Sequence, residues 1–315
     1  IKRNYALPSL GFLLQMDQII EFGSSANLRL TPGASAVLAD VTQSSLAGRI
    51  GQGLSILFAE AKGYNFLGHL ASDHSVRSHL ATTGRKRVAD FLFEHNDRSR
   101  MILESKASFT LQTNACTPIK SMLKRSLSEQ VDPWMGVVMP TPSKGYAVYS
   151  CLREVGNATP SAIIFVDPPG KDGGGPHVEL PRDWVRRQNY AAWLRAMGLS
   201  DAANWLWASP DTKIASKPAD VPMRVVSIDG RQYGILRLFE RPIRSTRMRF
   251  AIGIEVDALR AISAAIAGEP DALLKYQSQP REEQELAEPL SIFPDGTLFG
   301  LVHRRSLRQL ETFRL

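Results

Sequence analysis

The chain has 315 residues, of which 43% are hydrophobic and 22% charged, a composition that is ordinary for a globular protein with a sizeable core. Its formal net charge of +7 and isoelectric point of about 9.5 favour a polyanionic partner without identifying one. The two cysteines, Cys116 and Cys151, form no CxxC or metal-ligand spacing, so we expect a reduced, cytoplasmic protein. No apolar run reaches the roughly 18 residues that span a bilayer, and no signal segment is recognisable, so we expect no membrane partner.

Residues 1–43 alternate short strand-like pieces with turns rich in glycine, proline and serine, and we interpret them as an N-terminal strand and loop extension. Residues 44–62 place apolar side chains at helical spacing after serines that can cap a helix, so a helix is predicted there. Glu60 lies near the end of this helix, from which it could face a sheet.

Residues 63–86 contain three glycines and three histidines, the latter at His69, His74 and His79. Their five-residue spacing does not keep the histidines on one face of a helix or of a strand, and no cysteine lies nearby. We therefore interpret them as surface or hydrogen-bonded histidines and not as metal ligands.

The stretch from Arg87 to Ser108 contains two apolar runs, and each carries an acid where an acid is costly to bury. Asp90 lies inside the first run, Glu104 follows three apolar residues in the second, and a polar segment of hairpin-turn composition separates the runs. If both runs are strands of one sheet, Asp90 and Glu104 lie side by side, with Lys106 two residues further along the same face as Glu104. Two carboxylates and an ammonium that converge in this way can hold a divalent metal beside a phosphate.

A basic amphipathic helix is predicted over residues 118–131, and its lysines and arginines could either contact phosphate groups or simply face solvent. Two further strands are predicted at residues 145–152 and 162–166, and the nearly all-apolar second run is typical of a central strand. The glycine-rich loop at residues 168–176 lacks the spacing of a phosphate-binding loop, so we interpret it as a surface loop.

Residues 181–208 are rich in tryptophan and predict two helices that are separated near Gly198. A second unit of α/β character follows, with a hairpin signal at Asp229-Gly230 and a helix that Asp257 can cap and Gly268 ends. This unit also carries two arginine clusters that could track a phosphate backbone or be solvated. They are Arg241, Arg244, Arg247 and Arg249, and Arg304, Arg305 and Arg308.

Asp90, thirteen intervening residues and then Glu104-x-Lys106 resemble the active-site signature of the PD-(D/E)XK nuclease superfamily, which has the restriction-endonuclease-like fold. The resemblance covers roughly residues 44–166. The family core is a helix, three strands, a helix and a further strand, and the elements predicted here fall in that order. The first of the three strands has to lie somewhere in residues 63–80, where the strand signal is poor.

The resemblance implies that Asp90 and Glu104 hold a metal ion, with the backbone carbonyl of Ser105 as a further ligand. The ion is expected to be Mg²⁺ or Mn²⁺, because a hard cation with oxygen ligands both activates water and neutralises developing charge on a phosphate. By the same resemblance, Lys106 positions the attacking water or offsets that charge, and Glu60 is the candidate for a glutamate that some members supply from the first helix.

Other family members place a glutamine or a basic residue in the helix after the signature, where Lys124 and Gln130 are the nearest fits. The candidates for nucleic-acid binding in this helix are Lys120, Lys124, Arg125 and Gln130. Dimerisation is common in this superfamily, so a second copy of the chain is considered as a partner beside nucleic acid.

We therefore predict an α/β protein with a restriction-endonuclease-like mixed sheet flanked by helices and an additional C-terminal α/β unit. The expected division is an extension at 1–43, a nuclease-like core with a helical extension at 44–208, and the C-terminal unit at 223–315. The predicted function is a metal-dependent nuclease that hydrolyses phosphodiester bonds in DNA, with endonucleolytic cleavage favoured over exonucleolytic.

Two alternatives stay open. The first is a non-catalytic nucleic-acid-binding or assembly protein that keeps the nuclease-like fold. The second is an α/β enzyme unrelated to DNA whose C-terminal half carries the site, and a cleft lined by residues 224–315 would point to it.

Overall fold

The computed structural model describes residues 19–21, 28–37, 40–83, 87–109, 116–167, 176–208, 218–237, 248–277, 290–303 and 309–315. The chain divides into two compact units. The core unit contains the described residues from 19 to 64 and from 69 to 180, and the C-terminal unit contains Asn65–Gly68 and the described residues from Pro181 onward. The helices at 181–208 thus group with the C-terminal unit, whereas the sequence had placed them with the nuclease-like core.

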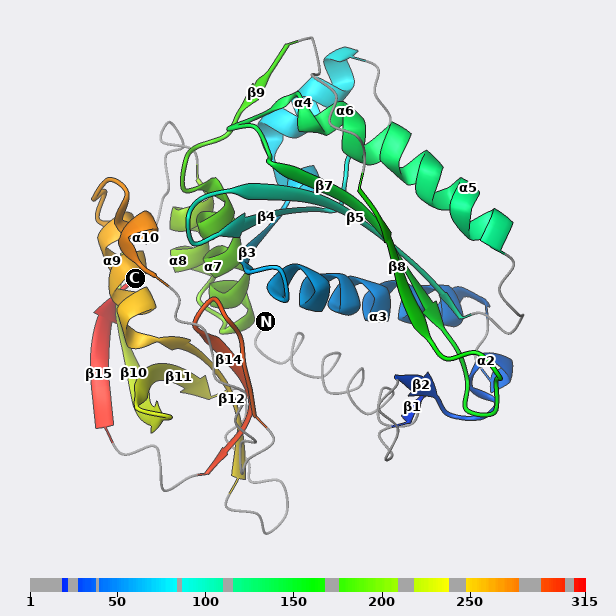
Figure 1. Ribbon diagram of the computed structural model, residues 1–315. Helices are drawn as coiled ribbons and strands as arrows, with labels where there is room; N and C mark the ends of the chain where they lie inside the picture. The colour runs from blue at the N-terminus through cyan, green and yellow to red at the C-terminus, as the bar shows by residue number, and fades with distance from the viewer. Residues whose placement is uncertain are drawn as a thin grey trace. The chain divides into compact units, whose positions relative to one another are not determined.

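A five-stranded mixed sheet has the strand order β3-β4-β5-β7-β8, and all of its strands belong to the core unit except for Asn65–Gly68 of β3, which group with the C-terminal unit. The strands are β3 Tyr64–His69, β4 Phe91–His95, β5 Arg100–Phe109, β7 Lys144–Leu152 and β8 Ala162–Val166. β4 and β5 are the antiparallel hairpin that the sequence predicts, β5 and β7 are parallel, and β7 and β8 are antiparallel. Helices flank the sheet (Figure 1), so the predicted α/β class with a mixed sheet between helices is confirmed.

The helix α3, Asp40–Glu60, covers one face of this sheet. Gly51 approaches β5 so closely that a Cβ at this position would lie 2.4 Å from the Cβ of Ala107, so the close packing of helix on strand requires glycine here. One helical turn further on, the hydroxyl of Ser55 donates to the hydroxyl of Ser105 at 2.9 Å. Because side chains alternate along a strand, the neighbouring residues of β5 point to the opposite face.

That opposite face is covered by α5, Cys116–Ser126, where Leu123 packs against Tyr149 and Cys151 of β7. The predicted helix at 118–131 is therefore present, but it does not continue as an α-helix to its end. A π-helical turn, η2 Leu127–Val131, replaces the last turn, and α6, Asp132–Met135, follows it. The wider turn leaves both Gln130 and Val131 buried.

The remaining elements of the core unit surround the sheet. Between β3 and β4 lie η1, Leu70–Ser72, and α4, His74–Thr83, so residues 63–80, where a strand was expected despite a poor signal, contain β3. The short N-terminal pieces are β1 Ile20–Glu21, β2 Arg29–Leu30 and α2 Ala34–Val37, and β6 Val138–Met139 pairs with β9 Val178–Glu179. The helix predicted from residue 44 begins earlier, at Asp40.

The prediction that residues 162–166 form a central strand is wrong. β8 is the last strand in the order of the sheet, next to β7. Ile164 and Val166 pack on the side of α5, whereas Ile163 and Phe165 on the other side are exposed. A nearly all-apolar run predicts burial on both faces of a strand, but here the second face is an exposed apolar surface.

The C-terminal unit is built on a six-stranded antiparallel sheet with the order β13-β14-β12-β11-β10-β15. The strands are β10 Asp220–Ile228, β11 Arg231–Arg237, β12 Met248–Glu255, β13 Leu290–Ile292, β14 Thr297–His303 and β15 Gln309–Arg314. Asp229 and Gly230 have positive φ angles of 49° and 76°, so they form the predicted two-residue hairpin turn. The side chains of both arginine clusters lie outside the described residues.

Four helices belong to the same unit. They are α7 Trp184–Ala196, α8 Ser200–Trp207, α9 Val256–Ile266 and α10 Ala272–Lys275. α9 packs on the sheet at Gly234, where a Cβ would lie 2.5 Å from Leu259 Cδ1. The buried carboxylate of Asp295 accepts hydrogen bonds from Asn189 and Trp193 of α7, which ties this helix to the β13–β14 hairpin. Within the described ranges, no helix is both long and apolar enough to cross a membrane.

Candidate functional site

Asp90 and Glu104 face each other where the pairing of β4 with β5 ends. The register pairs Phe91 with Leu103, so Asp90 and Glu104 occupy the next positions along the two strands. The backbone N–H of Asp90 donates to Glu104 Oε2 at 3.0 Å, and the N–H of Ser105 donates to Asp90 Oδ2 at 3.0 Å. Each carboxylate therefore accepts a hydrogen bond from the opposite chain segment, and the two are held side by side as the hairpin interpretation predicts.

Lys106 lies on the same strand and face as Glu104, and its Nζ forms an ion pair with Glu104 Oε1. The Glu104 side chain is completely buried, whereas 33% of the Lys106 side chain is exposed. Asp90 is half-buried. The three charged groups therefore form one cluster that begins in the protein interior and reaches solvent through Lys106.

The cluster perturbs the acid at its centre. Burial, and then the negative charge of Asp90, raise the pKa of Glu104 from 4.5 to about 7, although the ammonium of Lys106 acts in the opposite direction. The Lys106 ammonium pairs with Glu104, and Asp90 adds a second carboxylate, so these three groups carry a surplus of one negative charge when all are ionised. A cation bound between the carboxylates would lower this pKa again.

His69, which sequence reasoning did not assign to the site, is a further group beside Asp90. It is the last residue of β3, and its ring lies 4.9 Å from the ring of Phe91, centroid to centroid. Although part of the residue is exposed, loss of water around the ring lowers the pKa of His69, and this outweighs the charge of Asp90 and a hydrogen bond to the Asp90 backbone. The five-residue histidine spacing concealed this position, because only the pairing of β3 with β4 brings His69 to Asp90.

Gln130 is the one nucleic-acid-binding candidate whose side chain contacts the segment that leads into the site. It is buried, and its Nε2 donates to the backbone carbonyl of Val88 at 3.3 Å. Close by, Trp134 Nε1 donates to the carbonyl of Arg87 at 3.0 Å. The π-helical turn and α6 therefore hold the chain just before Asp90, and Gln130 serves this contact rather than facing solvent.

The basic candidates on α5 are all exposed. Arg125 Nε pairs with Glu129 at 2.8 Å, and Glu129 also pairs with Arg87 at 3.3 Å. Lys120 and Lys124 lie one helical turn apart on the solvent side of the helix. This arrangement is compatible with both interpretations of the basic face, phosphate contact and solvation.

Glu60 lies at the C-terminal end of α3, the helix that packs on the Ser105 side of β5. Glu104 and Lys106 point to the other face of the sheet. The helix that carries Glu60 therefore lies on the face opposite to Glu104, which does not fit the predicted role of Glu60 in the metal site. The Ser105 side chain faces α3, and its N–H is bonded to Asp90. The role predicted for its carbonyl, a metal ligand, stays a prediction.

The site offers two carboxylates, those of Asp90 and Glu104, as possible metal ligands. Mg²⁺ or Mn²⁺ would fit such a site better than a metal ion that takes three or four ligands from the protein. Among the residues that the structure describes, no group of three or more His, Cys, Asp or Glu is placed to hold a metal ion. Mg²⁺ commonly binds through one or two carboxylates and completes its shell with waters and substrate phosphates. Burial is the main cause of the raised pKa of Glu104, the charge of Asp90 is the second, and a cation bound beside Glu104 would act against both.

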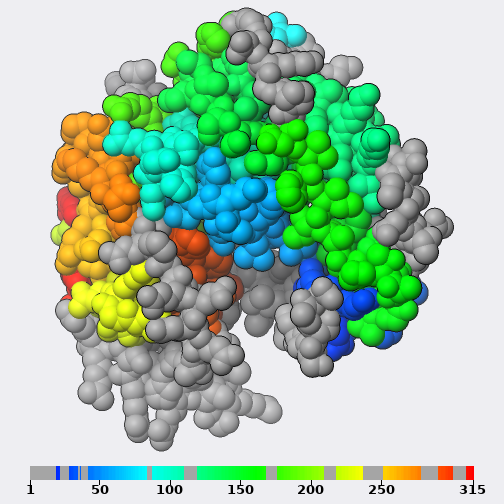
Figure 2. Space-filling model, in the orientation of Figure 1, coloured from blue at the N-terminus to red at the C-terminus, as the bar shows by residue number. Residues whose placement is uncertain are grey.

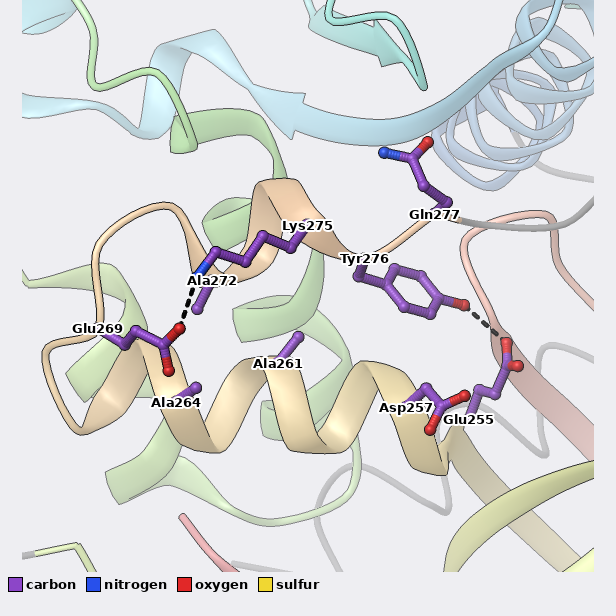
Figure 3. Close-up of a pocket in the computed structure, with 9 residues that line it drawn as sticks. All are labelled: Glu255, Asp257, Ala261, Ala264, Glu269, Ala272, Lys275, Tyr276 and Gln277. Atoms are coloured by element: carbon purple, nitrogen blue, oxygen red, sulfur yellow. Dashed lines mark hydrogen bonds and ion pairs between the residues drawn. The ribbon is translucent and has the colours of Figure 1, made fainter.

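A pocket of about 400 Å³ lies in the C-terminal unit, on α9 and α10 (Figure 3), and no predicted site residue lines it. Ala261, Ala264 and Ala272 form its apolar part. At one end Tyr276 donates its hydroxyl to Glu255 Oε2 at 2.6 Å, and at the other Lys275 pairs with Glu269 at 2.6 Å. This is a cleft within residues 224–315, which is the feature expected for the second alternative, an α/β enzyme whose site lies in the C-terminal half.

Comparisons of the chain with protein-family models, with curated proteins and with solved structures find no match. The nuclease superfamily therefore stays a resemblance, carried by the Asp90, Glu104 and Lys106 signature. Any function has to be argued from the geometry of these residues and from the order of the elements around them.

Proposed function

We propose that this protein is a metal-dependent nuclease with a restriction-endonuclease-like core. The observation that carries the proposal is the pairing of Asp90 with Glu104 across β4 and β5, with Lys106 on the same face of the sheet. The order of the elements supports it. A helix (α3), three strands (β3, β4, β5), a helix (α5) and a further strand (β7) occur in the order of the family core, with η1 and α4 inserted between β3 and β4 and with η2, α6 and β6 inserted between α5 and β7.

In this proposal Asp90 and Glu104 hold the cation, and the Ser105 carbonyl completes the protein ligands. When bound, the cation supplies an acidified water and neutralises charge on the phosphate. The Lys106 side chain is one-third exposed, so its ammonium can reach a phosphate in solvent as well as Glu104, with which it pairs. It can orient the attacking water or stabilise the extra negative charge that develops on the phosphate.

The neighbouring residues position this cluster. Gln130 holds the carbonyl of Val88, two residues before Asp90, and His69 interacts with the Asp90 backbone from β3. Neither group needs to touch the substrate to matter, because a shift of Asp90 by about 1 Å would misplace the cation and lower the rate considerably.

The test is a cleavage assay on plasmid DNA, linear duplex, single-stranded DNA and RNA, with Mg²⁺, Mn²⁺ or a chelator. We expect metal-dependent cleavage that falls by about 100-fold or more in Asp90→Asn and in Lys106→Met. Asp97→Asn is the matched control, because it makes the same change in the exposed turn of the same hairpin. Thermal unfolding shows whether each variant is folded.

Full activity in folded Asp90→Asn, or no metal-dependent cleavage of any of these substrates by the wild type, would overturn the proposal. Salt-sensitive DNA binding without cleavage would instead support the non-catalytic alternative, in which the fold is kept for nucleic-acid binding or assembly.

The pocket on α9 and α10 favours a second candidate, an enzyme whose site lies in the C-terminal unit. Its volume falls in the range of small-molecule sites, and polar groups lie at both ends of an apolar wall. The two candidates respond in opposite ways to substitution. Ala264→Leu fills part of the pocket and should abolish an activity located there, whereas Asp90→Asn should not affect it.

A further inference from the structure

Three aromatic rings from different elements of the core unit meet at one place. They belong to Phe58 of α3, Tyr146 of β7 and Phe165 of β8, and we call them the aromatic cluster. The ring centroid of Phe58 lies 5.4 Å from that of Tyr146 and 4.8 Å from that of Phe165. The centroids of Tyr146 and Phe165 lie 6.1 Å apart. The planes of Tyr146 and Phe165 are nearly perpendicular, at 78°, so the cluster has walls in more than one orientation.

The ammonium of Lys62 sits against all three rings. Its Nζ lies 5.0 Å from the centroid of Phe58, 5.4 Å from Tyr146 and 5.6 Å from Phe165. A cation within about 6 Å of a ring centroid is attracted by the negative face of the ring. The three rings therefore attract one cation together, and the Lys62 ammonium shows that a positively charged nitrogen fits between them.

The cluster reaches solvent mainly through Phe165 of β8, the last strand in the sheet order, whereas Tyr146 is only 7% exposed. Phe165 is 50% exposed, and Ile163, which lies on the same face of β8, is 40% exposed. Figure 2 shows the blue atoms of α3 and the green atoms of β8 next to each other on the visible face. An exposed apolar surface with aromatic rings is typical of a binding site.

Lys62 can leave the cluster at low cost. It lies in the turn after α3, its residue is exposed, and none of the ion pairs within the described ranges includes it. A primary ammonium is strongly hydrated, so contact with the rings removes water that it holds well. A trimethylammonium group spreads the same charge over apolar methyl groups, and aromatic cages bind it preferentially.

We propose that Phe58, Tyr146 and Phe165 form a binding site for a trimethylammonium group, which Lys62 occupies when no ligand is bound. The site is independent of the proposed nuclease chemistry, because the rings lie on the α3 side of the sheet and Glu104 and Lys106 on the α5 side. Choline and trimethyllysine carry the same group, and separate titrations distinguish these two sources.

The experiment is a calorimetric or NMR titration of the full chain with choline, with trimethyllysine and with 3,3-dimethylbutan-1-ol, the uncharged isostere of choline. We expect at least one of the two cations to bind, and the isostere to bind several-fold more weakly. Lys62→Gln should tighten cation binding about threefold, because it removes the competing ammonium. Phe165→Leu keeps an apolar side chain but removes a ring, and it should weaken binding by a similar factor.

Arg77→Gln is the control for the loss of a surface charge, since Arg77 is an exposed residue of α4 and should leave binding unchanged. Equal binding of the isostere and the cations would reduce the site to an apolar surface and overturn the proposal. So would unchanged affinity in folded Lys62→Gln or Phe165→Leu, or the absence of saturable cation binding in both the wild type and Lys62→Gln.

Discussion

The two ends of the β4–β5 hairpin each bury an acid on the same face of the sheet, but they balance its charge differently. At one end Glu94 lies opposite Arg100, whose Nε donates to Glu94 Oε2 at 3.4 Å, and both side chains are almost completely buried. At the other end Asp90 and Glu104 lie side by side, and the one ammonium there, that of Lys106, pairs with Glu104 and remains partly exposed.

The difference teaches that a buried acid does not by itself indicate a functional site. The guanidinium of Arg100 is always charged, so the Glu94 end is electrically balanced and closed to solvent. The Asp90 and Glu104 end has a surplus of negative charge next to solvent, and burial, together with the charge of Asp90, raises the pKa of Glu104. A surplus of this kind is what a divalent cation neutralises.

Breaking the balanced end should have the largest effect on stability. Arg100→Met leaves the buried Glu94 carboxylate without this counter-charge, and we expect the free energy of unfolding to fall by about 3–5 kcal/mol. The double variant Glu94→Leu/Arg100→Met should recover most of the loss, because it removes both charges together. Chemical denaturation measures both variants. Equal destabilisation by the single and the double variant would mean that packing, and not charge, sets the cost.

The unbalanced end predicts a pH dependence that the balanced end does not share. Because the pKa of Glu104 is raised from 4.5 to about 7, the folded protein keeps a proton between these pH values that the unfolded chain has lost. Stability should therefore fall as the pH rises through this window, by about 3 kcal/mol in total. Glu104→Gln should remove this fall in denaturation curves recorded across the window. Parallel pH profiles of wild type and variant would contradict the assignment.

A divalent cation should restore stability at the unbalanced end alone. Above the pKa of Glu104, Mg²⁺ at 100 times its dissociation constant should raise the free energy of unfolding by about 2.7 kcal/mol. Asp90→Asn should lose this gain, whereas the control Asp97→Asn should keep it. Thermal unfolding with MgCl₂, against KCl of equal ionic strength, measures the effect without reference to cleavage. Equal stabilisation of Asp90→Asn and wild type would place the cation elsewhere.

The sequence alone was sufficient for the local features of this protein. The β4–β5 hairpin and the common face of Asp90, Glu104 and Lys106 follow from side-chain alternation over a short stretch, and the structure has both. The hairpin turn at Asp229-Gly230 is likewise a local choice, because both residues adopt the positive φ angles that the turn needs.

Features that depend on packing between segments far apart in the chain could not be predicted from the sequence. His69 reaches Asp90 through the pairing of β3 with β4, and Gln130 is buried in a π-helical turn, from which its Nε2 donates to the carbonyl of Val88. The apolar sequence of β8 does not indicate whether both faces of the strand are covered. The sequence therefore did not predict that β8 is the last strand of the sheet.

The sequence by itself thus determined which acids and which lysine share one face of a hairpin, because strand alternation acts between near neighbours in the chain. The tertiary structure decided what surrounds them: the histidine beside Asp90, the helix that covers each face of the sheet, and the three rings around Lys62. The physical reason is that burial and electrostatic environment arise from contacts between segments far apart in sequence. The pKa of Glu104 depends on such contacts, and with it the proposed affinity for a cation.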